Sequence, residues 1–401
     1  MTNQYVVLRT VVPDPPEHTF RSPESAPTEP IQFSIEREQL SPADADKLAG
    51  DEQVALAPDI PVRLIAPLEE EEFDLTMRGN DALAGDGRTA WGIEAVGAAS
   101  CPWTGLGTTV AVLDTGIDSS HPAFDDVVIV PKDFTGEGDG DRNGHGTHCT
   151  GTIAGRACDG VRIGVAPGVA RVLVGKILDH RGAGSTTAIA EGIGWAVMNG
   201  ADVISMSVGF DFYALFQDLM QHMHREAALS TALTTYRDNL RLFDRIAALA
   251  RSQTAYAGGA VLVAAAGNES RRDRGKPYEV ETSLPAAAEW MMSVGALERH
   301  GATLRAAPYS NSKPDLVAPG SGVLSAQTGG GLVAKTGTSM ATPHVAGVAA
   351  LWFEQLRASQ DGWSGRQLAE FVEDRVRGTA LPLLSDQGPR LVGRGLVKCP
   401  S

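Results

Sequence analysis

Short apolar runs alternate with helical patterns through most of the chain after residue 90. The runs are continuous, rich in β-branched residues and bounded by turn residues, as expected of strands that are covered on both faces. They are TTVAVLD (108–114), VARVLVGKIL (169–178), ADVISMSVG (201–209) and AVLVAAAGN (260–268). Between them, residues 144–155 and 186–200 have helical patterns. The alternation predicts an α/β fold with a doubly wound, mostly parallel sheet and helices on both faces.

A further buried helix is predicted towards the C-terminus. The run HVAGVAALWFEQL (344–356) is almost wholly apolar until Glu354, which predicts burial on most faces of the helix. Pro343 lacks an N–H and is tolerated in the first turn of a helix, so we expect the helix to begin near Ser339. Ser339 is then either the N-cap of this helix or a nucleophile that the helix presents.

The first 66 residues have a different pattern and predict a separate, small α+β unit. Residues 5–12 and 31–35 are rich in strand formers, and residues 52–65 return to extended structure. SPADADKLAG (41–50) predicts a short helix with Ser41 as its N-cap. Residues 67–89 contain EEEE at 69–72 and several glycines, which predicts an exposed linker that proteases can reach. The remaining residues, 90–401, form the large domain.

Residues 210–257 separate two predicted strands by more than one crossover helix requires. Apolar residues recur there at intervals of three and four, which predicts a pair of amphipathic helices inserted into the large domain. Such a stripe packs against a core more often than it forms a binding groove. The insertion therefore has several interpretations: it covers a cleft, gates access, docks a protein partner, or decorates the outer helices.

Composition and charge exclude several classes of protein. The 401 residues are 43% hydrophobic, which is enough for a large core without cross-links. The four cysteines are irregularly spaced and predict free thiols rather than a zinc site. A net charge of −15 (34 basic minus 49 acidic residues) argues against a nucleic-acid surface. The N-terminus does not resemble a secretion signal, and no run is long enough to span a membrane. We therefore expect a cytoplasmic, bacterial-like protein in a reducing compartment.

Polar residues lie where the carboxyl ends of the predicted strands meet the helix starts. Asp114 and Asn268 each end a strand run, His145 opens a glycine-flanked helix, and Ser339 opens another. Ligands bind at this edge of parallel sheets. Each residue alone has an ordinary structural interpretation, as a turn carboxylate, a structural histidine or a cap. Together they supply a hydroxyl nucleophile, a base, a carboxylate that orients the base, and an amide donor for an oxyanion.

The same blocks identify a family. VAVLDTGID, NGHGTHCTGTIAG, AAAGN and GTSMATPHVAG resemble, in this order, the Asp, His, oxyanion Asn and Ser blocks of the subtilisin-like serine proteases, or subtilases. The resemblance covers residues 90–360 and implies a serine endopeptidase that acts on polypeptides with the triad Asp114, His145 and Ser339 and the oxyanion donor Asn268. The order of the blocks excludes the α/β-hydrolases, and HGTH lacks the HExxH pattern of zinc proteases.

The resemblance also implies the substrate contacts. It places Ser207, Val208 and Gly209 on the edge strand that pairs with an extended peptide, and Ala266 and Gly267 on the opposite wall of the pocket. Ser283 or Leu284 forms the pocket floor. Because such a pocket is not strongly charged, we expect an apolar or small side chain before the cleaved bond. Cys149 follows HGTH, as in thiol-containing subtilases, and is interpreted as a structural thiol or as a site of sensitivity to oxidation.

By position, residues 1–66 are similar to the subtilase propeptide, which inhibits by placing its C-terminal tail in the cleft. This implies a self-inhibited zymogen with a maturation site in LEEEEFDLTMRGNDALAG (68–85). The family requires no cofactor, although many members bind calcium. The acidic residues Asp133, Glu137, Asp139 and Asp141 are either a calcium site or a solvated loop, and no EF-hand spacing is present. A catalytically silent binding module is the alternative from a different class.

Overall fold

The computed structural model describes residues 3–11, 31–72, 82–85, 87–252, 258–301, 303–359, 365–383 and 387–401. Its centre is an eight-stranded sheet of order β14-β13-β12-β10-β6-β8-β7, with β15 beside β13. All of its strand pairs are parallel except β13 with β14. The strands are β6 (Thr109–Asp114), β7 (Val128–Asp133), β8 (Arg171–Lys176), β10 (Val203–Met206), β12 (Val261–Ala265), β13 (Met291–His300), β14 (Thr303–Ala306) and β15 (Leu316–Pro319). The predicted doubly wound sheet is confirmed.

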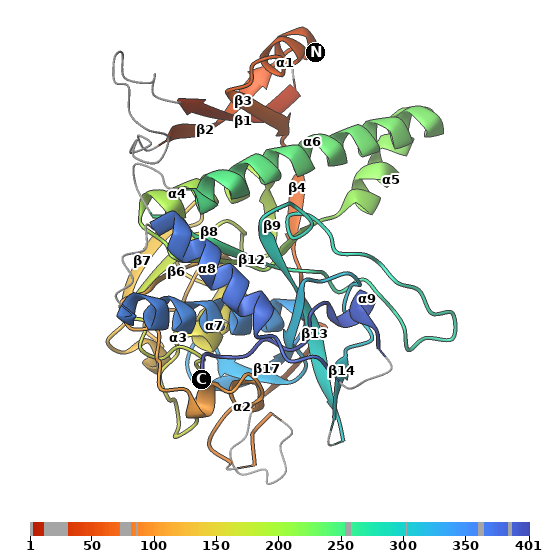
Figure 1. The fold of residues 1–401 in the computed structure, drawn as a ribbon. Helices are drawn as coiled ribbons and strands as arrows, with labels where there is room; N and C mark the ends of the chain where they lie inside the picture. The colour runs from red at the N-terminus through yellow and green to blue at the C-terminus, as the bar shows by residue number, and fades with distance from the viewer. Residues whose placement is uncertain are drawn as a thin grey trace, which may run out of the picture.

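Helices cover both faces of this sheet (Figure 1). One face packs against α3 (His145–Ala154) and α7 (Thr338–Ala358), with α2 (Trp91–Ala95), α8 (Gly365–Gly378) and α9 (Pro389–Val392) further out. The other packs against α4 (Thr186–Met198) and α6 (Arg225–Arg251). Val110 and Val112 of β6 belong to the first core, and Ala111 and Leu113 belong to the second. This alternation follows from the two-residue period of a strand and explains why the run is apolar at every position.

The N-terminal unit is a three-stranded sheet of order β2-β1-β3 with one helix. It contains β1 (Asn3–Val11), β2 (Gln32–Leu40), α1 (Pro42–Leu48) and β3 (Val54–Pro58). Ser41 caps α1 by accepting a hydrogen bond from the Asp44 N–H, as the sequence predicted. Val6 and Leu8 are buried in the same core as α4 and α6. The unit therefore shares a core with the large domain.

The insertion forms the predicted helices, α5 (Phe212–His222) and α6. Figure 1 shows α6 lying between the N-terminal sheet and the central sheet. Asn239 of α6 is fully buried; its amide donates to the Pro58 carbonyl, and its oxygen accepts from Thr186. Arg245 donates to the Glu52 carbonyl. This part of α6 contacts the chain's own N-terminal unit, and nothing in these contacts supports a separate protein partner.

Residues 61–72 correct the prediction of a linker that begins at residue 67. β4 (Pro61–Leu64) is the middle strand between β11 (Val208–Phe210) and β9 (Ala183–Ser185). β5 (Glu69–Glu72) pairs with β17 (Leu332–Thr336), which also pairs with β16 (Val323–Ala326). The acidic run is therefore a strand, because backbone hydrogen bonds to an open sheet edge do not require apolar side chains. Of the rest of the predicted linker, residues 73–81 and 86 lie outside the described residues.

Within the described ranges, no helix is long and apolar enough to cross a bilayer.

Candidate active site

Asp114 and His145 form a buried pair at the carboxyl edge of the central sheet. Asp114 ends β6 and His145 is the first residue of α3. Their side chains are 1% and 0% exposed, and His145 Nδ1 lies 2.8 Å from Asp114 Oδ1. With Nδ1 donating to the carboxylate, Nε2 is the free, basic nitrogen. His145 Nε2 is buried and has no hydrogen-bond partner among the described residues.

Neighbouring polar groups hold this pair in place. The Thr115 N–H donates to Asp114 Oδ1 at 2.8 Å, and the buried Lys176 donates to the Thr115 carbonyl at 2.7 Å. Asp141 accepts from the Gly144 N–H and from both the N–H and the hydroxyl of Thr147. Burial alone would raise the pKa of Asp141, but these hydrogen bonds outweigh it and lower the pKa. Asp141 therefore fixes the start of α3, and with it His145.

Ser339 is the second residue of α7, which begins at Thr338. The N-cap is Gly337, so the interpretation of Ser339 as a cap is wrong. Pro343, four residues after Ser339, has no N–H to donate to the Ser339 carbonyl. That carbonyl instead accepts from the Ser207 hydroxyl at 3.3 Å and from the Cys149 thiol at 3.5 Å. Because Pro343 leaves the Ser339 carbonyl without a helical donor, this carbonyl binds Cys149 of α3 and Ser207 instead, which fixes the position of Ser339.

Asn268 is held with its amide nitrogen facing the peptide segment that the Ser339 hydroxyl also contacts. Its Oδ1 accepts from the Thr338 N–H at 2.9 Å and from the Thr338 hydroxyl at 2.8 Å. Its Nδ2 is therefore directed outward, and it donates to the Ala66 carbonyl at 3.1 Å. The Ser339 hydroxyl donates to the Ile65 carbonyl at 2.6 Å. The structure thus brings the predicted Ser339 and Asn268 to two successive carbonyls of one peptide segment.

That segment, residues 61–72, runs along the whole site. The Leu64 N–H donates to the Gly182 carbonyl at 2.7 Å, and the Ile65 N–H donates to the Ser207 carbonyl at 3.2 Å. Val208 and Gly209 pair with Leu64 and Arg63 in the antiparallel register of β11 with β4. Past the site, the Leu68 N–H donates to the Thr336 carbonyl at 2.8 Å, and β5 continues on β17. The predicted peptide-binding edge at 207–209 therefore binds the chain's own residues.

Ile65 is buried at the site and is only 5% exposed. A Cβ at Gly209 would lie 3.2 Å from Ile65 Cγ1 and 3.6 Å from Ser283 Oγ, so glycine leaves the space that Ile65 uses. Ser283 donates its N–H to the Ala266 carbonyl at 3.2 Å, which joins the predicted floor of the pocket to the predicted opposite wall. Gly267 has φ of 112°, which favours glycine.

Sequence reasoning missed Asn311, which organises this wall. Asn311 is fully buried, and its Oδ1 accepts from the N–H groups of Glu269 and Ser270. Its Nδ2 donates to the Ala266 carbonyl at 3.1 Å and to the Glu269 carboxylate at 2.6 Å. A single asparagine in a polar loop has no periodicity or motif that marks it for this role. Asn311 nevertheless holds the loop that carries Asn268.

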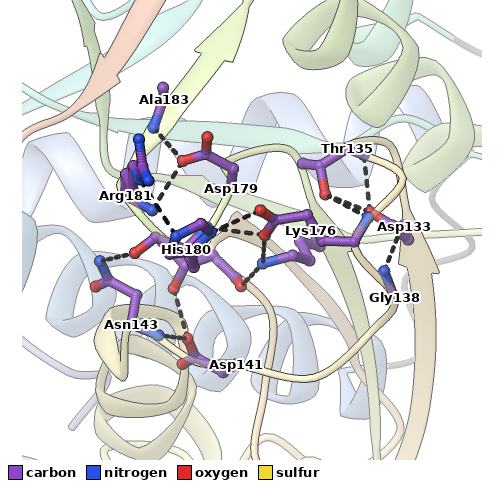
Figure 2. Close-up of polar contacts among 12 residues, drawn as sticks. Asp133, Thr135, Gly138, Asp141, Asn143, Lys176, Asp179, His180, Arg181 and Ala183 are labelled. Carbon is purple, nitrogen blue, oxygen red and sulfur yellow. Dashed lines mark hydrogen bonds and ion pairs between the residues drawn. The ribbon is translucent and has the colours of Figure 1, made fainter.

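The acidic residues 133–141 do not fit a calcium site (Figure 2). Asp133 accepts from the N–H groups of Thr135 and Gly138. Glu137 accepts from the His180 N–H at 2.9 Å and lies 3.6 Å from Lys176 Nζ. These carboxylates and Asp141 point at N–H, O–H and ammonium donors, whereas calcium needs six to eight oxygen ligands. Asp139 alone does not make a site. The calcium interpretation is thus replaced by a protein-held loop.

Cys149 and His148 are buried beside the site. Burial, followed by the charge of Asp114, holds the pKa of Cys149 well above its ordinary value, so the thiol stays protonated. Cys149 Sγ lies 3.7 Å from His145 Nδ1. Burial, helped by the charges of Lys335 and His145, holds the pKa of His148 well below its ordinary value. One ligand atom from each of Asp114, His145 and Cys149 lies within 4.8 Å of the others.

The sequence is similar to a family model and to several known proteases. A model of the subtilase family matches residues 105–390. An intracellular serine protease of Paenibacillus polymyxa is 34% identical over 303 residues, which cover 73% of this chain and 79% of that protein. A subtilisin of Bacillus pumilus is 36% identical over 299 residues, covering 74% of this chain and 90% of that protein. Subtilisin E of Bacillus subtilis (strain 168) is 36% identical over 283 residues, with coverage of 69% and 61%.

Proposed function

The chain belongs to the subtilase family and is a serine endopeptidase; from this premise we propose that it cleaves polypeptides through an acyl-enzyme on Ser339. The observation that carries the assignment is the Asp114–His145 pair at 2.8 Å, whose second imidazole nitrogen is buried and unpartnered among the described residues. A buried acceptor without a partner costs about 1–3 kcal/mol. A base kept in that state is suited to take the proton of a nucleophile.

The proposed reaction gives each of these groups a defined role. Ser339 Oγ attacks the substrate carbonyl carbon while His145 Nε2 takes its proton, and Asp114 stabilises the imidazolium. The Asn268 Nδ2 and the Ser339 N–H donate to the oxyanion, with added support from the positive end of the α7 dipole. The imidazolium then returns the proton to the departing amine. Water, activated by the same imidazole, hydrolyses the ester and restores the Ser339 hydroxyl.

We predict that Asn268→Ala lowers kcat by about 10²- to 10³-fold, because one oxyanion donor is lost. Steady-state hydrolysis of a quenched peptide with isoleucine before the cleaved bond measures this effect. Asn268→Asp is the matched variant: it keeps an oxygen for Thr338, removes the donor and adds a negative charge beside the oxyanion, so a loss at least as large is expected. An unchanged kcat in Asn268→Asp would remove Asn268 from the mechanism.

We propose further that residues 1–66 inhibit the uncut chain as a propeptide-like domain, with 90–401 as the catalytic domain. Support comes from the mismatch in the cleft, where the nucleophile's hydroxyl faces the Ile65 carbonyl while the oxyanion donor faces the Ala66 carbonyl. Hydrolysis needs both groups on the same carbonyl. The segment therefore occupies the site in a register that is not cut, and a cut within 68–85 would separate the inhibitor from the enzyme.

Ile65→Arg is predicted to raise the initial activity of the uncut chain by about 10- to 100-fold. A guanidinium is larger than the isoleucine side chain and must lose its water in the buried position of Ile65, which disfavours the inhibited state. The measurement is the initial rate of chain whose intact mass has been verified. Arg63→Ala is the control, because Arg63 is 65% exposed and its pair with Asp211 contributes little. Equal rates for Ile65→Arg, Arg63→Ala and the parent chain would contradict inhibition by this segment.

A further inference from the structure

Two of the four cysteines, Cys101 and Cys399, lie beside each other, and the proposed mechanism uses neither. Cys101 directly follows the short helix η1 (Ala98–Ser100), and Cys399 lies in the segment after α9. Their side chains share a hydrogen bond, and Cys101 Sγ lies 3.3 Å from the Pro400 carbonyl oxygen. A Cβ at Gly97 would lie 3.1 Å from Cys399 Sγ. The two thiols are therefore neighbours, although most of the chain separates them in sequence.

Hydrogen bonds to the backbone hold the segment of Cys399 against the turn that carries Cys101. The Cys399 N–H donates to the Val96 carbonyl at 2.9 Å, directly before that turn. Lys398 Nζ donates to the Ala95 carbonyl at 3.0 Å, at the end of α2. From the other side, the indole N–H of Trp352 in α7 donates to the Lys398 carbonyl at 3.4 Å. The position of the two thiols relative to each other is thus set by the fold on both sides of Cys399.

The pair differs chemically from the other two cysteines. Cys149 and Cys158 are buried, and burial raises the pKa of both thiols. Cys101 and Cys399 are partly exposed. The hydrogen bond from Cys399 lowers the pKa of Cys101 to about 7, with a smaller contribution from the charge of Arg162, and the same hydrogen bond raises the pKa of Cys399. Cys101 is therefore the thiol of the pair that ionises near neutral pH, and the thiolate is the form that attacks disulfides.

We propose that Cys101 and Cys399 form a thiol–disulfide exchange site, at which a small-molecule disulfide of the glutathione class converts the two thiols into an internal disulfide. The Cys101 thiolate attacks one sulfur of the reagent, which releases one small thiol and leaves a mixed disulfide on Cys101. Cys399 then loses its proton, and its sulfur attacks the Cys101 sulfur and releases the second small thiol. The protein gives up two electrons and two protons, and the reagent takes up both as its own disulfide is reduced to two thiols.

The bond joins two distant parts of the chain into one ring. This ring contains all four proposed site residues: Asp114, His145, Asn268 and Ser339. A cross-link between residues so far apart in sequence restricts the unfolded chain, which stabilises the folded state. The bond also keeps the segment of Cys399 on α2. The oxidised chain is therefore the more stable form, and this inference does not depend on which residue is the nucleophile.

Mass spectrometry of the reduced full chain, carrying Ser339→Ala to keep it intact, tests the site directly. Excess oxidised glutathione near neutral pH is expected to remove two hydrogens, to leave no bound glutathione, and to join the peptides of Cys101 and Cys399. Cys399→Ser should stop at one glutathione on Cys101, because the second attacking thiol is absent. Cys158→Ser is the matched control and should form the internal disulfide like the parent chain.

Several outcomes of that experiment would overturn the proposal. They are no reaction of the folded chain, glutathione retained on both Cys101 and Cys399, a disulfide that includes Cys149 or Cys158, and a disulfide between two chains. Circular dichroism identifies a serine variant that fails to fold, and the alanine variant of the same cysteine then replaces it.

Thermal unfolding and hydrogen exchange measure the effect of the bond. The oxidised chain is expected to unfold about 5 °C above the reduced chain. The amide of Cys399, which donates to the Val96 carbonyl, should exchange about tenfold more slowly after oxidation. A dithiol reductant should reverse both changes, and the double variant Cys101→Ser/Cys399→Ser should show neither. Unchanged unfolding and exchange in a chain whose internal disulfide has been verified would contradict its stabilising role.

Discussion

Ser339→Ala is expected to lower kcat/KM for peptide hydrolysis by about 10⁶-fold, which is the loss measured for the triad serine in subtilisin itself. The reason is that alanine leaves no nucleophile, while the pocket and the Asn268 donor remain. Any cut that the chain makes within residues 68–85 should disappear with the activity. The measurements are kcat/KM on a quenched peptide and the intact mass of the purified chain over time.

Thr342→Val is the control for this variant. Thr342 lies in the same helix, and its hydroxyl donates to the Thr338 carbonyl without reaching the site. Its activity should stay within about threefold of the parent enzyme. Residual activity of Ser339→Ala above about 1% would show that another residue is the nucleophile, provided that thermal unfolding confirms the same folded state.

Asp114→Asn is expected to lower kcat by about 10⁴-fold with little change in KM. The carboxylate accepts the Nδ1 proton of His145 and leaves Nε2 free to act as the base. An amide in its place can donate to Nδ1, which moves the histidine proton to Nε2 and removes the base. The expected loss is therefore larger than for Asn268→Ala, although the new side chain has the same size and is still buried.

Kinetics between pH 6 and 9 and near-UV circular dichroism test this prediction together. Unchanged dichroism with a loss of about 10⁴-fold supports the role of the carboxylate in fixing the tautomer. A loss smaller than about tenfold across this range would mean that His145 is oriented by something else. A variant that fails to fold would be replaced by Asp114→Glu, which keeps the acceptor and should retain more activity than Asp114→Asn.

The central sheet and the site residues on it were predictable because their signals are local. A strand buried on both faces is apolar at every position, and β6 shows this from Val110 to Leu113. Asp114 and Asn268 stand out as the first polar residues after such runs. Parallel topology then brings strand ends and helix starts to one edge, which places His145 and Ser339 beside them.

The pattern of residues 61–72 predicted extended structure only as far as residue 65, and the pairing of β5 was not predictable, because it depends on partners far away in the chain. β4 has no strong pattern of its own, and its register is set by the open edges of β11 and β9. The run of four glutamates has the composition of a solvated linker, yet β17 pairs with its backbone. Pairing through backbone groups is invisible to an analysis of side-chain periodicity.

Polar residues in loops were the other class whose roles sequence reasoning left open or missed. The carboxylates of 133–141 have the composition of a calcium loop, but His180 and Lys176 come from a distant strand and the loop that follows it. Asn311 lies in a segment without motif or period and still connects Ala266, Glu269 and Ser270. Their roles arise from which donors the fold places opposite them.

The most direct test is the rate and site of fluorophosphonate labelling in intact and cut chain, mapped by mass spectrometry. The account predicts one labelled residue, Ser339, with slow labelling while residues 61–72 remain attached and labelling about 10²-fold faster once they are removed. Labelling at another residue, no labelling of the cut chain, or equal rates for intact and cut chain would contradict it.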